Sequence, residues 1–250
     1  MPTYFRIQFN DKNAAKALGA RWSKEHELWY AEQQDVAIAL ASRWTQTEPL
    51  TPIEVFPGED RQFGEHPKLA VDLIPSTCWF TNVRSCVSKD DWKRISMGVK
   101  RRAGITCELC GGSEDPASGV FLEPHERFSY EDDVQTLRRL VCICSTCHLA
   151  THFGHAQATG QEEAARLQLA KVNAWDGPTV ERHIREAFEL WSDRSRDDWF
   201  LDLAIIEHSS VNVLLPSTEQ RQSAGVNLNV IRPKDGSPND FLDSLGLSLR

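Results

Sequence analysis

Long apolar stretches are missing from this sequence. Nowhere in its 250 residues do about 18 apolar residues follow one another, the length that a membrane-spanning helix requires. Residues 1–6 also lack the charged and apolar zones of a secretory signal peptide. We therefore expect a soluble, cytoplasmic protein that has no membrane partner.

Basic residues are too few to give the whole protein a positive surface. The chain has 28 lysines and arginines against 36 acidic residues, a formal net charge of -8, which argues against a surface coated with nonspecific DNA-binding sites. Residues 84–102 are a local exception, with seven basic and two acidic side chains. Such a run is typical of a nucleic-acid-binding face, although a solvated helix face would explain it equally well. The candidate nucleic-acid-binding residues are Lys93, Arg94, Lys100, Arg101 and Arg102.

A paired set of cysteines suited to disulfides is also absent. The seven cysteines are an odd number, and four of them form two Cys-x-x-Cys pairs, which is typical of metal binding in a reducing compartment. Four thiolates are the usual tetrahedral shell of structural zinc, and the ion supplies folding free energy that a small core lacks. We predict one structural Zn²⁺ bound by Cys107, Cys110, Cys144 and Cys147. The others, expected to be buried free thiols, are Cys78, Cys86 and Cys142.

The composition is that of an ordinary globular protein. With 40% hydrophobic and 26% charged residues, most of the chain should fold, and its length allows one large domain or several small ones. Prolines and glycines among charges at residues 47–72 are typical of a linker. The polar range 204–250 is expected to be a partly loose extension, with one short helix near 241–247. We therefore expect folded units at 1–46 and 73–203.

The first unit has a pattern of alternating strands and helices. We expect a strand over 5–9, a helix from Asn10 or Asp11 to Gly19, a strand over 28–30 and a helix over 36–44. The sequence Lys-Ala-Leu-Gly-Ala-Arg-Trp at 16–22, followed by Leu-Trp-Tyr at 28–30, resembles the DUF5710 domain family.

That resemblance covers residues 1–46 and implies an accessory binding module of DNA-processing proteins, with a protein partner but no known chemistry. We interpret Trp22 and Trp29 as core residues rather than as a base-stacking platform.

The second unit should be mostly helical around one strand. Ser88 followed by Asp91 predicts a capped helix that leads to the first cysteine pair, and Thr179 is the expected cap of a later amphipathic helix in which His183 packs. The expected strand is 120–126, and the expected helices are 88–99, one beginning at 144–147, 164–172, 179–191 and a continuation over 199–203.

A histidine pattern follows the second cysteine pair. His148 and His152 are four residues apart, so on a helix they share one face and can bind one ion. The expected strand 120–126 carries His125 toward a turn. This strand, followed by Cys-x-x-Cys-His-x-x-x-His, resembles the HNH nuclease family, which has a treble-clef, ββα-metal fold. The resemblance implies that His125, His148 and His152 bind a catalytic divalent cation, Mg²⁺ or another, and that Glu126 or His125 acts as the base.

Two positions depart from the family pattern. If His125 is a ligand, the base falls on Glu126; if His125 is the base, Pro124 occupies the ligand position and cannot bind metal. The asparagine that fixes the family's catalytic loop falls on Arg139. These departures leave the identity of the base open.

The fold class predicted from these patterns is α+β, with a small N-terminal αβ module, a linker, and a zinc-stabilised HNH-like treble clef embedded in helices. The function that the resemblance implies is an HNH-type endonuclease that hydrolyses DNA phosphodiester bonds, in which a base activates water while the cation neutralises the phosphate. One alternative is a catalytically inactive zinc module that binds nucleic acid. Another is a zinc-folded adaptor that binds a protein.

Overall fold

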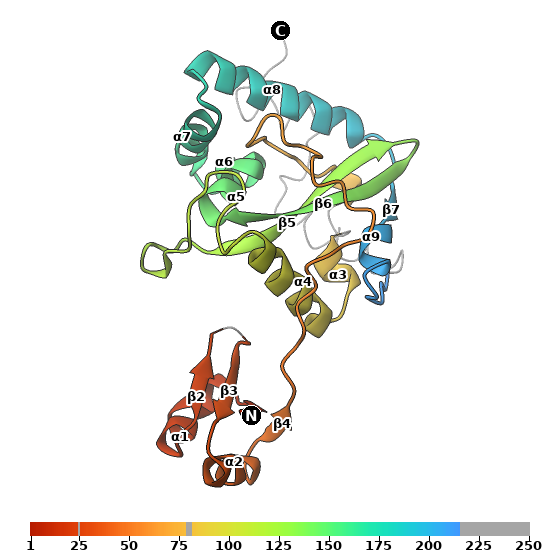
Figure 1. Ribbon diagram of the computed structural model, residues 1–250. Helices are drawn as coiled ribbons and strands as arrows, with labels where there is room; N and C mark the ends of the chain where they lie inside the picture. Colours follow the sequence, from red (N-terminus) through yellow and green to blue (C-terminus); the bar gives the residue numbers. More distant parts are fainter. Residues whose placement is uncertain (25, 79–81, 216–250) are drawn as a thin grey trace, which may run out of the picture. The chain divides into compact units, whose positions relative to one another are not determined.

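Both parts of the chain combine helices with small sheets, so the predicted α+β class is confirmed. The computed structural model describes residues 1–24, 26–78 and 82–215 (Figure 1). The chain divides into two compact units, Met1–Thr51 and Pro52–Arg250. Across the described ranges, none of the helices combines the length and the apolar character needed to span a bilayer. The short helix expected near 241–247 lies outside the described residues.

The first unit is a four-stranded sheet with two α-helices. Neighbouring strands are antiparallel in the order β2-β3-β1-β4. The strands are β1 (Thr3–Arg6), β2 (Arg21–Ser23), β3 (Leu28–Ala31) and β4 (Thr45–Thr47), and the helices are η1 (Phe9–Asp11), α1 (Lys12–Ala17) and α2 (Gln34–Ala41). Because β2 and β4 are short and polar, the apolar pattern used for prediction missed them.

The core of the first unit differs from the prediction at two aromatic residues. The expected strand over 5–9 ends at Arg6, and Phe9 begins a 3-10 turn with its side chain 76% exposed. Trp29 is buried beside Phe5, as predicted. Trp22 is not a core residue, because it remains 47% exposed while its ring lies edge-on to Trp29.

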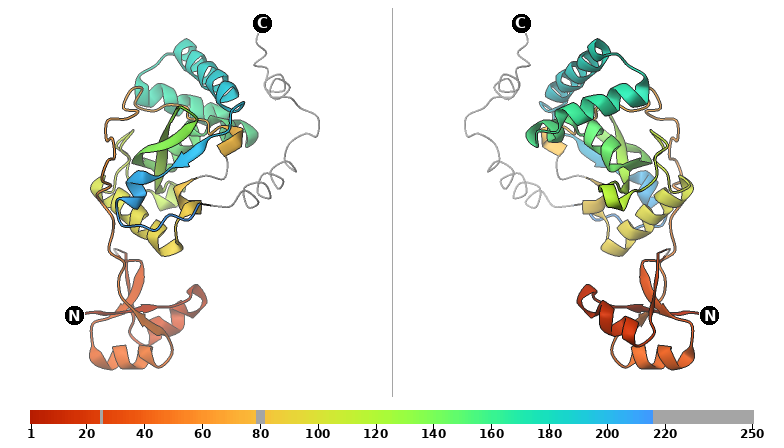
Figure 2. Two further views of the ribbon diagram at one scale, coloured as in Figure 1. Left: turned by 90° about the vertical axis from the view of Figure 1, so that its right-hand side faces the viewer. Right: turned by 90° about the vertical axis from the view of Figure 1, so that its left-hand side faces the viewer.

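The second unit is built on a long β-hairpin. β5 (Leu122–Glu131) pairs antiparallel with β6 (Val134–Cys144), and β7 (Phe200–Asp202) pairs parallel with β6. Figures 1 and 2 show α4 at one side of this hairpin and α7 and α8 at the other. The other elements are η2 (Ser76–Cys78), α3 (Val83–Cys86), α4 (Lys89–Arg102), η3 (Pro116–Ser118), α5 (Ser145–Thr151), α6 (Phe153–Ala158), α7 (Glu162–Asn173), α8 (Gly177–Arg194) and α9 (Ala204–Glu207).

Local signals located some of these elements better than others. The predicted cap of α4 is present, since the Ser88 hydroxyl accepts a hydrogen bond from the Asp91 backbone N–H at 3.0 Å. The cap of α8 is Asp176 rather than Thr179, because the Asp176 carboxylate accepts from the Thr179 N–H at 2.9 Å. The range 199–203 is not helical, because part of it forms β7 and satisfies the open edge of β6.

The segment after Thr51 packs into the second unit, so the predicted linker 47–72 is too long. Its irregular backbone matches the prediction, but four of its side chains are buried in the core, namely Ile53, Phe56, Leu69 and Val71. The Ile53 N–H donates to the Arg94 carbonyl of α4 at 3.0 Å. A Cβ on Gly98 would lie 1.7 Å from the Ile53 carbonyl oxygen, so this approach requires glycine.

Two polar side chains hold the end of this segment against α7 and α8. Asn173 accepts from the Leu69 N–H at 3.0 Å and donates to the Leu69 carbonyl at 2.7 Å, so it pairs as another backbone would. The His183 Nε2 accepts from the Val71 N–H at 2.9 Å. His183 is therefore a packed, hydrogen-bonded histidine, as the sequence indicated.

Candidate metal sites

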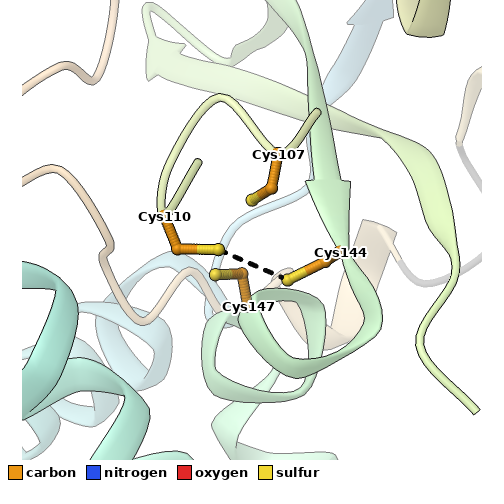
Figure 3. Close-up of side chains that lie close together, drawn as sticks. All are labelled: Cys107, Cys110, Cys144 and Cys147. Atoms are coloured by element: carbon orange, nitrogen blue, oxygen red, sulfur yellow. Dashed lines mark hydrogen bonds between the residues drawn. The ribbon is translucent and has the colours of Figure 1, made fainter. Parts of the chain in front are cut away.

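The four cysteines of the two Cys-x-x-Cys pairs come together, with their thiols pointing toward one another (Figure 3). Their sulfur atoms all lie within 4.8 Å of one another, and the Cys110 and Cys144 sulfurs are 3.7 Å apart. A tetrahedral shell with Zn–S distances of about 2.3 Å requires sulfurs about 3.8 Å apart. Cys107 and Cys110 lie in the loop after α4, Cys144 ends β6, and Cys147 lies in α5. This cluster can therefore hold a metal such as zinc.

The loop of the first pair turns as a metal knuckle does. Gly111 has a φ of 74°, and its N–H donates to the Cys107 carbonyl at 2.8 Å. The Gly112 N–H then points to the Cys110 sulfur at 3.4 Å. Because a side chain at Gly111 would strain this left-handed conformation, glycine there is part of the site.

Polar donors also surround the second pair. The Thr146 hydroxyl lies 3.2 Å from the Cys144 sulfur, and the Gln168 amide of α7 donates to the Cys147 sulfur at 3.1 Å. Donors at sulfur favour the thiolate form that binds metal. Gln168 was not predicted, because nothing in the local spacing connects α7 with α5.

The sulfurs influence one another's protonation. Hydrogen bonds with Cys107 and then Cys147 lower the pKa of Cys144, whereas the hydrogen bond with Cys144 is the main cause that raises the pKa of Cys107 to about 11. Four thiolates this close repel one another, so a dication is the counter-charge that they require.

A second cluster contains three predicted histidines. His125 on β5 faces His148 of α5 and His152, which follows that helix. The ring centroid of His125 lies 5.3 Å from that of His148 and 5.0 Å from that of His152, and the centroids of His148 and His152 are 4.6 Å apart. One ligand atom of each lies within 4.8 Å of the others, so the three can share one cation.

The protonation state of these rings suits metal binding. His125 is only 5% exposed, and its Nδ1 is buried without a hydrogen-bond partner among the described residues. Burial, followed by the charges of His152 and His148, lowers the pKa of His125 well below its usual value. Burial and then His148 lower the pKa of His152 to about 4. Both rings are therefore neutral at pH 7 and offer lone pairs, and an ion would satisfy the unpaired nitrogen.

Two other motif positions have hydrogen-bond partners outside the histidine cluster. Glu126 follows His125 along a regular strand, so its side chain points to the opposite face of β5. Its carboxylate accepts from the Val83 N–H at 3.2 Å, and burial raises its pKa. Arg139 is 7% exposed and donates to the Glu108 carboxylate at 3.0 Å. These hydrogen bonds hold the Glu126 carboxylate at the start of α3 and the Arg139 guanidinium at the loop of the first cysteine pair.

The predicted basic face of α4 consists largely of ion pairs. Lys93 is half-buried. The pairs are Arg94 with Asp91 at 2.9 Å, Lys100 with Glu114 at 3.7 Å and Arg101 with Glu54 at 3.9 Å. Arg102 differs from the prediction. Its side chain is only 9% exposed, and its guanidinium donates two hydrogen bonds to the Glu59 carboxylate, at 2.6 and 2.7 Å. It braces the core and does not offer its charge to nucleic acid.

We expect Arg102→Ala to lower the free energy of unfolding by about 3–5 kcal/mol, because it leaves the buried Glu59 carboxylate without its counter-charge. The matched control is Arg101→Ala on the same helix, whose ion pair is more exposed and should contribute about 1 kcal/mol or less. Urea unfolding followed by circular dichroism measures both. Equal losses in the two variants would contradict the structural role of Arg102.

Comparison with known proteins identifies one region of the chain. Residues 3–46 match the family model described as Domain of unknown function (DUF5710), which confirms that part of the predicted resemblance. No curated protein and no solved structure matches the chain. The resemblance to HNH nucleases therefore has no support from these comparisons.

Proposed function

We propose that the second unit is a metal-dependent, HNH-like nuclease that hydrolyses DNA phosphodiester bonds. The observation that carries this proposal is the convergence of His125, His148 and His152 next to the four-cysteine cluster. Helix α5 joins the two clusters, because Cys147 and His148 are consecutive on it. A zinc ion at the cysteines would thus hold the helix that carries His148 and leads to His152.

The donor set indicates the kind of cation. Three imidazoles suit zinc and neighbouring transition metals better than Mg²⁺, which prefers oxygen ligands. They also leave coordination positions open for water and a phosphate oxygen. Once bound, such an ion lowers the pKa of its water and neutralises charge on the phosphate. Because Glu126 points away, we assign no role in this chemistry to it.

One histidine of the cluster is partly exposed to solvent, and helix α4 carries a lysine whose charge acts on the neighbouring Glu123. The His148 side chain is 28% exposed, so the cluster is open on this side. The hydrogen bond from His148 is the main cause that lowers the pKa of Glu123, and the Lys100 ammonium adds to the lowering. The Lys100 ammonium also lies 3.7 Å from the Glu114 carboxylate, and we propose it as a contact for a phosphate bound at the cluster.

Cleavage of supercoiled plasmid tests the proposal directly. The purified chain, freed of loosely held ions by a mild chelator, is incubated with plasmid and Zn²⁺, Ni²⁺, Co²⁺, Mn²⁺ or Mg²⁺ in turn. We expect nicking that requires an added cation and is faster with transition metals. Intact plasmid under every condition would exclude the nuclease function.

A second candidate is a catalytically inactive zinc module that binds nucleic acid. It is favoured by the hydrogen bonds of the two motif positions, because Glu126 is bound to Val83 and Arg139 to Glu108 rather than to a histidine of the cluster. This candidate predicts DNA binding that weakens with salt and is not followed by cleavage. If the chain neither binds nor cleaves DNA, the remaining proposal is an adaptor that binds a protein.

We expect Lys100→Ala to weaken DNA binding to a similar degree for all sequences and to reduce the salt dependence by about one phosphate contact. The matched control is Lys171→Ala, which removes an exposed lysine from α7. Fluorescence anisotropy with a labelled duplex at several salt concentrations measures both variants. An unchanged salt slope in Lys100→Ala would remove this residue from the interface.

A further inference from the structure

We propose that Glu123 is a positioning residue that holds one tautomer of His148 and turns its Nε2 toward the cation. This inference deepens the proposed function and rests on the histidine cluster described above. Glu123 has no part in the zinc motif and does not bind the ion itself. Its effect on the cation is exerted through the ring of His148.

The contact that carries the inference is short and specific. The His148 Nδ1 lies 2.8 Å from the Glu123 carboxylate oxygen. A carboxylate can only accept a hydrogen bond, so the Nδ1 of His148 must carry the proton. The remaining lone pair of the neutral ring is then on Nε2. Metal-bound histidines in proteins commonly have such a partner, which fixes the orientation of the ring and makes it a better ligand.

Strand β5 explains why Glu123 reaches this position. Glu123 and His125 are two residues apart on a regular part of the strand, so both side chains point to the same face. The backbone of Glu123 is held opposite Ile143 of β6. A single strand therefore supplies one histidine of the cluster and the carboxylate that orients another.

The other two histidines of the cluster differ from His148. The Nδ1 of His125 is buried and lacks a hydrogen-bond partner within the described ranges, and His152 lies at the boundary between α5 and α6. The His148 side chain is also 28% exposed, so packing restrains it less than it restrains His125. His148 is therefore the ring that depends most on an orienting partner.

The test measures binding of a second cation to the full chain that already holds its structural zinc. Isothermal titration with Co²⁺ gives the affinity, and long-range ¹H–¹⁵N spectra of histidine-labelled protein give the tautomer of His148. We expect Glu123→Ala to lower the affinity for Co²⁺ by about 10–100-fold. Without the carboxylate, the His148 ring should no longer be held in the tautomer that carries its proton on Nδ1. Glu123→Gln should lose less of the Co²⁺ affinity, because the amide oxygen of glutamine can still accept a hydrogen bond from the Nδ1 of His148.

The control variant is Glu131→Ala, which removes an exposed carboxylate from the far end of β5 and should bind Co²⁺ as the unchanged chain does. Retained zinc and an unchanged far-ultraviolet spectrum show that each variant is folded. If the unchanged chain binds no second cation, the proposed metal site itself is wrong. If it binds Co²⁺ and both Glu123 variants bind equally well with the same tautomer, only the role of Glu123 is overturned.

Discussion

Replacing Cys147 with alanine should abolish tight zinc binding and unfold the second unit. Cys147 of α5 is fully buried, and its sulfur belongs to the four-cysteine cluster and accepts a hydrogen bond from Gln168 of α7. Structural zinc contributes on the order of 10–16 kcal/mol of apparent binding free energy, which is comparable to the whole stability of a domain. Without that ion, the loop that carries Cys107 and Cys110 loses its sulfur-mediated link to α5, and its hydrogen bonds between Glu108 and Cys142 of β6 remain.

The matched control for this prediction is Cys142→Ala, which removes another fully buried thiol of the same unit. Cys142 is outside the cluster, so its loss should leave the zinc in place and cost about 1 kcal/mol through a small cavity. Native mass spectrometry counts the zinc, and thermal unfolding followed by circular dichroism measures stability. Equal unfolding temperatures for Cys147→Ala and Cys142→Ala would show that the cysteine cluster does not support the fold.

His152→Ala should remove the second cation and plasmid nicking while the structural zinc remains. The substitution takes away one of three imidazoles that share a cation site. Loss of a direct ligand should reduce nicking by at least about 100-fold, more than the loss of an outer partner usually does. The fold should survive, because His152 is no part of the cysteine cluster.

His155→Ala is the matched control, since this exposed histidine lies one turn further along the chain. It should nick plasmid at the unchanged rate. Nicking that survives in both His152→Ala and His125→Ala would exclude the histidine cluster as the active site. The two substitutions also distinguish the two clusters. Cys147→Ala should lose both the structural zinc and the second cation, whereas His152→Ala should lose only the second cation.

Local patterns in the sequence were sufficient for features that lie within one element. The two Cys-x-x-Cys pairs predicted a four-sulfur cluster, because each pair forms its own turn. The spacing of His148 and His152 predicted that their rings lie together, which they do although His152 follows the end of α5, and Ser88 predicted the start of α4. These predictions needed only the geometry of a helix or a turn. The DUF5710 resemblance was likewise predicted from the motifs at 16–22 and 28–30, and the family model matches residues 3–46.

The tertiary structure alone decided which faces meet. It placed Glu123 at His148, turned Glu126 to the other side of β5, and buried Arg102 against Glu59. The hairpin register and the packing of α5 determine these contacts, and both depend on residues far apart in the chain. A sequence pattern shows which side chains lie on one face of a helix or strand. Which other element packs against that face depends on how the whole core is buried.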